Sequence, residues 1–138
     1  MKKNEPLTQI MSTGLQTIHG GEPVSKLRAI FESGGIHHVP VVSGEKLIGI
    51  VSWHDFARIS FGEFGNQSST SLDQTLDHLY TIQDVMVSDP LTIQKSGTIR
   101  DAARLLGTNN FNSLPVVEGD KLVGIVTSTD LIRYLADQ

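Results

Sequence analysis

Two short segments of the chain place a hydroxyl residue directly after Gly and two apolar residues and three positions before an aspartate. Ser52 precedes Asp55 and Thr127 precedes Asp130, each after two apolar residues that are typical of the buried end of a strand. If a helix begins there, its free N–H groups and the positive end of its dipole favour an anion. The aspartate could accept hydrogen bonds from a vicinal diol such as ribose. The arrangement suits a nucleotide, although the same residues also make a good helix cap.

The two segments belong to a duplicated unit. Pro40 and Pro115 lie 75 positions apart, and nine of thirteen residues are identical between residues 39–51 and 114–126. This period is longer than that of solenoids and propellers, so it indicates two copies of one small domain. Copies of roughly 55 residues barely sustain a core of their own, so we expect them to bury apolar faces against one another. We place the copies at residues 6–59 and 81–135, with a linker and short helix at residues 60–80.

The composition argues against several classes of function. The chain of 138 residues carries 15 acidic and 11 basic residues, with no basic block, which argues against nucleic acid as the main partner. Without cysteine it has no thiolate zinc site, and it has no apolar run near the ~20 residues that span a membrane. No Walker-type phosphate loop or metal-spaced cluster of carboxylates is present. We therefore expect no enzyme, no required cofactor or metal, no membrane partner and a cytoplasmic location.

Hydrophobic spacing predicts the element order β-α-β-β-α in both copies. The expected elements of the first copy are a strand near residues 15–18, a helix over 24–31, a hairpin over 39–51 and a helix from Trp53. Those of the second copy are a strand near 91–93, helices over 99–106 and 128–135, and a hairpin over 114–126. Pro40 predicts an edge strand or the first residue of a strand. In the linker, leucines at helical spacing predict a short helix capped by Ser71.

Three features recur in both copies and are specific in combination. They are the hairpin, the pattern of Gly, two apolar residues, Ser or Thr, any two residues and Asp, and a methionine before the first strand, Met11 and Met86. On these residues the chain resembles the CBS domain family, named for cystathionine β-synthase, as a stand-alone tandem pair or Bateman module. The resemblance implies an α/β (α+β) fold, in which two repeats pack sheet to sheet about a pseudo-twofold axis. It also implies clefts between the repeats for AMP, ADP, ATP or S-adenosylmethionine, and a homodimer that signals to an unknown effector protein.

The resemblance also assigns residues to the ligand. Ribose would be held by Asp55 and Asp130, and phosphate by the hydroxyl groups of Ser52, Thr127 and Thr129. The residues that would line the adenine are Ile125, His38 and Ile10 in the Asp130 cleft, and Ile50, Ser113, Val85 and Thr81 in the Asp55 cleft.

The two copies differ where the ligand would bind. The first copy has Trp53 and His54 where the second has Ser128 and Thr129, so its cleft lacks a hydroxyl group and gains a bulky ring. We therefore expect the Asp130 cleft to be the better nucleotide site. His54 could contact phosphate when protonated, or it could lie on the helix surface.

Two functions fit these residues. The leading one is a regulatory module that senses an adenine nucleotide. The rival is a ligand-independent interaction or dimerisation module, in which the hydroxyl–aspartate pairs only cap helices and Phe61 and Phe64 of the linker help to bind a partner. Loss of nucleotide binding in an Asp130→Ala variant that still folds would favour the first function.

Overall fold

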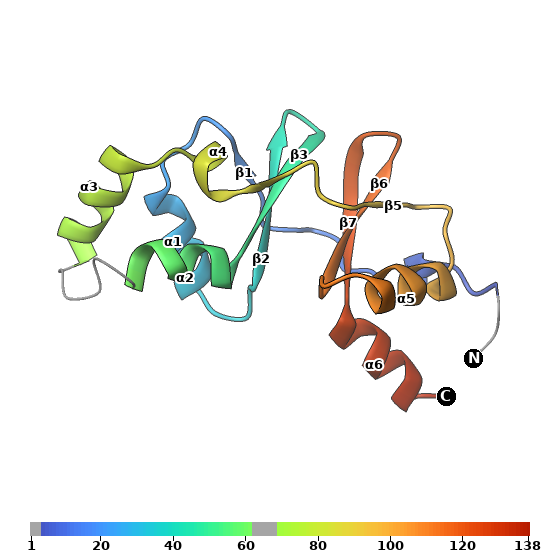
Figure 1. Ribbon diagram of the computed structural model, residues 1–138. Coiled ribbons are helices and arrows are strands. Elements are labelled where there is room, and N and C mark those ends of the chain that lie inside the picture. Colours follow the sequence, from blue (N-terminus) through green and yellow to red (C-terminus); the bar gives the residue numbers. More distant parts are fainter. Residues whose placement is uncertain (1–3, 62–68) are drawn as a thin grey trace. The chain divides into compact units, whose positions relative to one another are not determined.

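The computed structural model of the chain describes residues 4–61 and 69–138 and divides into two compact units (Figure 1). One unit comprises residues 16–90, and the other combines the N-terminal segment up to Leu15 with residues 91–138. The expected mixed fold of helices and strands is confirmed. Phe64 and the side chain of Phe61 lie outside the described residues. The compact units are thus offset from the sequence repeats, because each contains the lead-in of the other repeat. The lead-in is the segment up to Leu15 for the first repeat and residues 81–90 for the second.

The unit of residues 16–90 is built on the first hairpin. Its elements are β1 (Ile18–His19), α1 (Ser25–Glu32), β2 (His38–Ser43), β3 (Lys46–Ser52), α2 (Trp53–Phe61), α3 (Ser69–Leu79), α4 (Ile82–Val85) and β4 (Val87–Ser88). β2 and β3 pair antiparallel, while β1 joins β2 in parallel and β4 joins β3 antiparallel. Gly44 turns the hairpin with φ of 62°, in the left-handed region that glycine adopts at no steric cost.

The prediction that Pro40 marks a sheet edge or the start of a strand is wrong. Pro40 is the third residue of β2, which has β1 on one side and β3 on the other. The short β1 pairs only with Val41 and Val42, so the missing N–H of Pro40 removes no hydrogen bond from that ladder.

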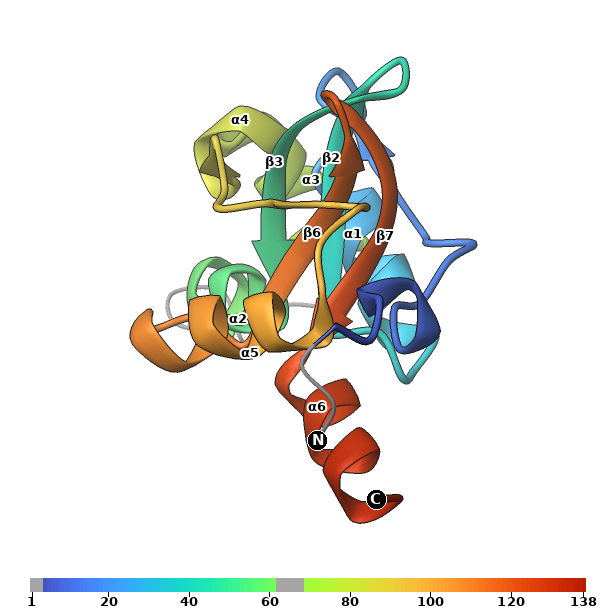
Figure 2. The ribbon, with the colours of Figure 1, turned by 90° about the vertical axis from the view of Figure 1, so that its right-hand side faces the viewer.

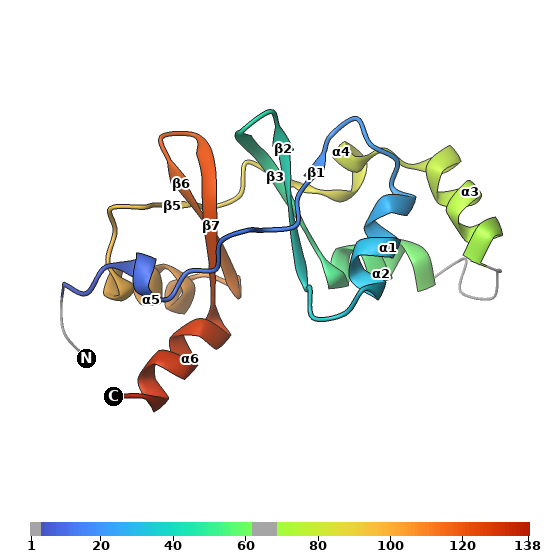
Figure 3. The same ribbon diagram turned by 180° about the vertical axis from the view of Figure 1, so that it is seen from behind.

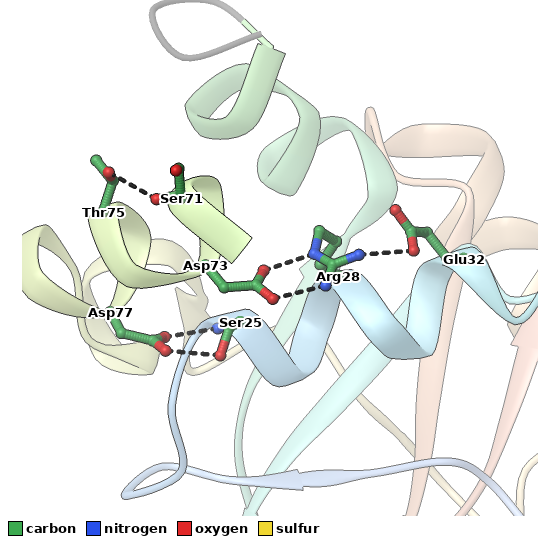
Figure 4. A network of polar contacts seen from close by, with 7 residues as sticks. All are labelled: Ser25, Arg28, Glu32, Ser71, Asp73, Thr75 and Asp77. Carbon is green, nitrogen blue, oxygen red and sulfur yellow. Dashed lines mark hydrogen bonds and ion pairs between the residues drawn. The ribbon is translucent and has the colours of Figure 1, made fainter. Parts of the chain in front are cut away.

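The linker helix α3 is fastened to α1 by charged side chains (Figure 4). Arg28 donates from Nε and Nη2 to the two carboxylate oxygens of Asp73, over 2.5 and 2.6 Å. The hydrogen bond to Asp73 is the main reason why the pKa of Arg28 is raised well above its ordinary value. Asp77 accepts from the backbone N–H and the hydroxyl of Ser25, over 2.8 and 2.7 Å. Asp77 therefore caps the start of α1 from a neighbouring helix.

The other face of α3 belongs to the hydrophobic core of the same unit. Leu72 and Leu76 are buried there, as the spacing of the leucines predicted. The prediction of a cap at Ser71 is wrong, because α3 already begins at Ser69 and the carbonyl of Ser71 accepts a hydrogen bond from the Thr75 hydroxyl.

The second unit is built on the second hairpin, which leads directly into α6 (Figure 2). Its elements are η1 (Leu7–Gln9), β5 (Ile93–Gln94), α5 (Ile99–Thr108), β6 (Ser113–Glu118), β7 (Lys121–Thr127) and α6 (Ser128–Ala136). β6 and β7 pair antiparallel and β5 joins β6 in parallel, so the predicted second copy of the hairpin is confirmed. No helix in the described parts of the chain is both long and apolar enough to cross a membrane.

The N-terminal lead-in is an integral part of this second unit, beside β7 and α5 (Figure 3). Leu7 is fully buried in its core, and Ser12 exchanges two backbone hydrogen bonds with Ile125 of β7, over 2.9 and 3.0 Å. Gly124 allows this approach, since a Cβ atom there would lie 2.9 Å from both Sδ of Met11 and the carbonyl oxygen of Ser12. The lead-in therefore reaches the start of α6 from the opposite end of the sequence.

Candidate functional site

The junction of β7 and α6 carries the second hydroxyl–aspartate pair. The backbone N–H of Thr127 donates to Oδ2 of Asp130 over 2.8 Å, and the N–H of Asp130 donates to Oγ1 of Thr127 over 3.2 Å. These reciprocal bonds form a capping box at the start of α6. The cap occupies one carboxylate oxygen, and Oδ1 of Asp130 accepts no hydrogen bond from the described part of the chain. Asp130 thus keeps one oxygen available for a ligand.

A pocket of about 310 Å³ opens beside Asp130. It lies within the unit formed by the lead-in and residues 91–138, and its lining residues are Gln9, Ile10, Asp130, Arg133, Tyr134 and Asp137. Four of them come from successive turns of α6 and its end, and two from the lead-in. The structure therefore brings together Ile10 and Asp130, two of the residues that the resemblance placed in one cleft.

The remaining candidates of the Asp130 cleft lie outside this lining. Thr129 is exposed on α6, while Ile125 is buried in β7 and bonded to Ser12. His38 is the half-buried first residue of β2, opposite Ser52, in the unit of residues 16–90.

The first hydroxyl–aspartate pair has the same cap but a more fully occupied carboxylate. Oδ2 of Asp55 accepts from the backbone N–H and the hydroxyl of Ser52, over 3.1 and 2.9 Å. Oδ1 accepts from Nη2 of Arg58 over 2.7 Å. The Arg58 side chain is 74% exposed, and such surface ion pairs are worth at most ~1 kcal/mol, so a ligand could displace it at modest cost. Without a ligand, however, both carboxylate oxygens of Asp55 accept hydrogen bonds.

Trp53 belongs to an aromatic cluster of the unit of residues 16–90. Its ring packs against Phe31 and Phe56, with ring centroids 5.7 and 6.4 Å apart, and so contributes to the core of the unit. The aromatic cluster of α1 and α2 therefore holds the Trp53 side chain, and the expectation that this ring adds bulk to the cleft stays a prediction. His54 lies exposed on α2.

The other candidates of the Asp55 cleft are distributed over both units. Thr81 caps α4 in a box with Asp84, whose pKa is lowered first by the bond from the Thr81 N–H and then by the Thr81 hydroxyl. Ile50 is half-buried in β3, next to β4, and Val85 packs against the core of the same unit. Ser113 is the first residue of β6, opposite Thr127.

Sequence reasoning did not identify Gln9, Tyr134 and Asp137 as lining residues. Tyr134 and Asp137 follow Asp130 at four and seven positions, a spacing that puts them on the same side of one helix, so this signal was present. For Gln9 the sequence held no such signal, because its position in the pocket depends on how the lead-in packs against the rest of the unit. Within residues 4–61 and 69–138, no three His, Cys, Asp or Glu side chains gather as a metal ion would require.

Comparison with known proteins identifies relatives over almost the whole chain. The family model for the CBS domain matches residues 7–62 and 82–137. The crystal structure of CBSX2 of Arabidopsis thaliana in complex with AMP aligns with a TM-score of 0.77 at 24% identity, covering 96% of this chain and 97% of that one. The CBS domain pair of MJ0100, in complex with 5′-methylthioadenosine and S-adenosyl-L-methionine, aligns with a TM-score of 0.76 at 25% identity over 98% of both chains.

Relatives found by sequence are often longer. An uncharacterized protein of Methanocaldococcus jannaschii is 28% identical over 98% of this chain, which corresponds to 33% of that protein. The chain spans between a third and a half of the first three curated relatives that it matches. Inosine-5′-monophosphate dehydrogenase of Thermoplasma acidophilum, 30% identical over 89% of this chain, is matched over only 22% of its length.

Proposed function

The chain belongs to the CBS domain family, and we propose that it is a regulatory module that senses an adenosine-containing ligand of the AMP, ADP or ATP type. S-adenosylmethionine is a further candidate. The pocket beside Asp130 is the observation that carries the proposal, because it joins a free carboxylate oxygen to the apolar side chain of Ile10. A carboxylate suits the ribose hydroxyls, and an aliphatic side chain suits one face of the purine.

The relatives support this choice of ligand class. One aligned CBS pair binds AMP and another binds 5′-methylthioadenosine and S-adenosyl-L-methionine, so adenosine is the part that their ligands share. The lining of the Asp130 pocket offers both polar acceptors and apolar surface for that shared part.

The proposed module acts through other proteins. Ligand binding stabilises the arrangement of the chain that binds it more tightly, and an effector protein responds to that shift. The module is proposed to form a cytoplasmic homodimer, for which the exposed side chains of Ile132 and Leu135 on α6 provide an apolar surface.

The rival function is a ligand-independent interaction module. The reciprocal caps at Ser52–Asp55 and Thr127–Asp130 favour it, because they give both pairs a structural role without any ligand. In that case the pocket beside Asp130 would be an ordinary surface depression.

A thermal-shift screen with adenosine, AMP, ADP, ATP and S-adenosylmethionine separates the two functions. A ligand that binds only the folded state raises the free energy of unfolding by about 2.7 kcal/mol when its concentration is 100 times Kd. The sensing function predicts a rise that is specific to one of these compounds. If none of them shifts a protein shown to be folded and free of copurified nucleotide, the interaction module is the better description.

A further inference from the structure

The hydroxyl group of Tyr134 is a buried polar group of the Asp130 pocket that no contact among the described residues explains. Its oxygen is buried, and it has no hydrogen-bond partner among the residues that the structure describes. Burying a hydroxyl group without a partner is unfavourable, so such a group needs an explanation. Tyr134 lines the pocket with Asp130, so a ligand there would lie next to this side chain, whose buried hydroxyl group must turn toward the pocket to reach the ligand.

The fold itself does not require this hydroxyl group. The matching position of the first copy, 75 residues earlier, is Ile59, which packs against the core of its own unit. An aliphatic side chain therefore suits this position in α2, the helix of the first copy that corresponds to α6. The second copy thus has a tyrosine hydroxyl donor near Asp130, whose Oδ1 accepts no hydrogen bond from the described residues. The first copy has no such donor at the matching position, and Oδ1 of Asp55 already accepts from Arg58.

We infer that Tyr134 is a specificity-determining residue of the Asp130 pocket and donates a hydrogen bond to a nitrogen or oxygen acceptor of a bound nucleoside. This inference rests on the proposed function. Asp130 accepts from the ribose and Tyr134 donates from the next turn of α6, so the two residues hold the nucleoside from one helix face. The Asp55 site lacks the donor, which makes the two sites chemically unequal.

The test is the Tyr134→Phe variant, which removes one oxygen atom and keeps the ring. Calorimetric titration with AMP and with S-adenosylmethionine measures Kd, and urea denaturation without ligand measures the free energy of unfolding. We expect Kd to rise about 2- to 13-fold, the range that corresponds to the net value of one neutral hydrogen bond. The unliganded variant should be as stable as the wild type or more stable, because an unpartnered buried group has been removed.

The matched control is Tyr80→Phe, which removes the hydroxyl group of the other tyrosine in the chain and should leave Kd unchanged. If the wild type binds either compound and Tyr134→Phe binds it equally well, the inference is wrong and the sensing function stands. A loss of stability in Tyr134→Phe without ligand would also overturn it, because the hydroxyl group would then have a structural partner such as buried water. If the wild type binds neither compound, the sensing function fails, and the inference with it.

Discussion

Replacing Asp130 by Asn separates the two roles that the structure gives to this carboxylate. Oδ2 of Asp130 accepts the capping bond from Thr127 over 2.8 Å, and an Asn side chain still has one carbonyl oxygen for that bond. The other oxygen becomes an NH₂ group, which cannot accept from a ribose hydroxyl. The variant should therefore keep the helix cap and lose the ligand.

The size of the effect follows from the charge of the acceptor. Hydrogen bonds to a charged group contribute about 1.5–3 kcal/mol, which corresponds to a loss of affinity of about 10- to 150-fold. The free energy of unfolding should change by less than ~1 kcal/mol, the usual value of one complete cap. Calorimetric titration gives the first quantity, and urea denaturation without ligand gives the second.

Asp55→Asn provides the comparison within the same chain. Because Oδ1 of Asp55 already accepts from Arg58, its replacement should reduce binding less than Asp130→Asn does. Equal affinity of Asp130→Asn and the wild type would refute the role of Asp130 in ribose binding. A larger loss of affinity in Asp55→Asn would show that the more occupied carboxylate holds the ligand, contrary to the reasoning from the two caps.

Two further predictions concern the elements that position the pocket. Gly124→Ala should destabilise the protein by ~1–3 kcal/mol and weaken ligand binding, because the new Cβ would press on the backbone of Ser12 and displace the lead-in that carries Ile10. Its control is Gly107→Ala in α5, where an added Cβ would meet no atom within 4 Å apart from its chain neighbours and the nearby helix backbone. Urea denaturation should show a gain in stability of up to ~1 kcal/mol for this control, and a control less stable than Gly124→Ala would contradict the role of the Ser12 contact. In the cap of α5, the pKa of Asp101 is lowered from its ordinary value of 3.8, first by the bond from the N–H of Thr98 and then by the Thr98 hydroxyl. A lowered pKa in the folded state means that the stabilisation is complete above 3.8 and is lost as the pH falls through the lower, folded value. Urea midpoints measured from pH 6 downwards should therefore fall less steeply below about pH 4 in Asp101→Asn than in the wild type, and parallel curves would contradict this account.

The sequence alone determined the local structure and the family. The hairpin around Gly44, its copy 75 residues later and the helices that follow each hairpin were predicted and are confirmed, because turn geometry and hydrophobic spacing act over a few residues. The resemblance to CBS domains is also confirmed by the family match. The mixed α/β (α+β) fold that this resemblance implied is confirmed as well.

The site residues followed from sequence only in part. Asp130 and Ile10 were named together and do share a pocket, while the roles of Thr129 and Ile125 remain predictions. Trp53 was considered only as a ring near the ligand, and the structure shows that it also packs against Phe31, because burial against other aromatic rings is favourable. Spacing within one helix does not reveal such a preference.

Only the tertiary structure decided how the ends of the chain meet. The lead-in joins residues 91–138 through the buried side chain of Leu7 and the paired bonds between Ser12 and Ile125. Ser12 and Ile125 lie 113 positions apart (125 − 12), so no local pattern encodes their contact. These contacts place Gln9 and Ile10 beside Tyr134, and a pocket that neither sequence copy contains by itself results from this long-range packing.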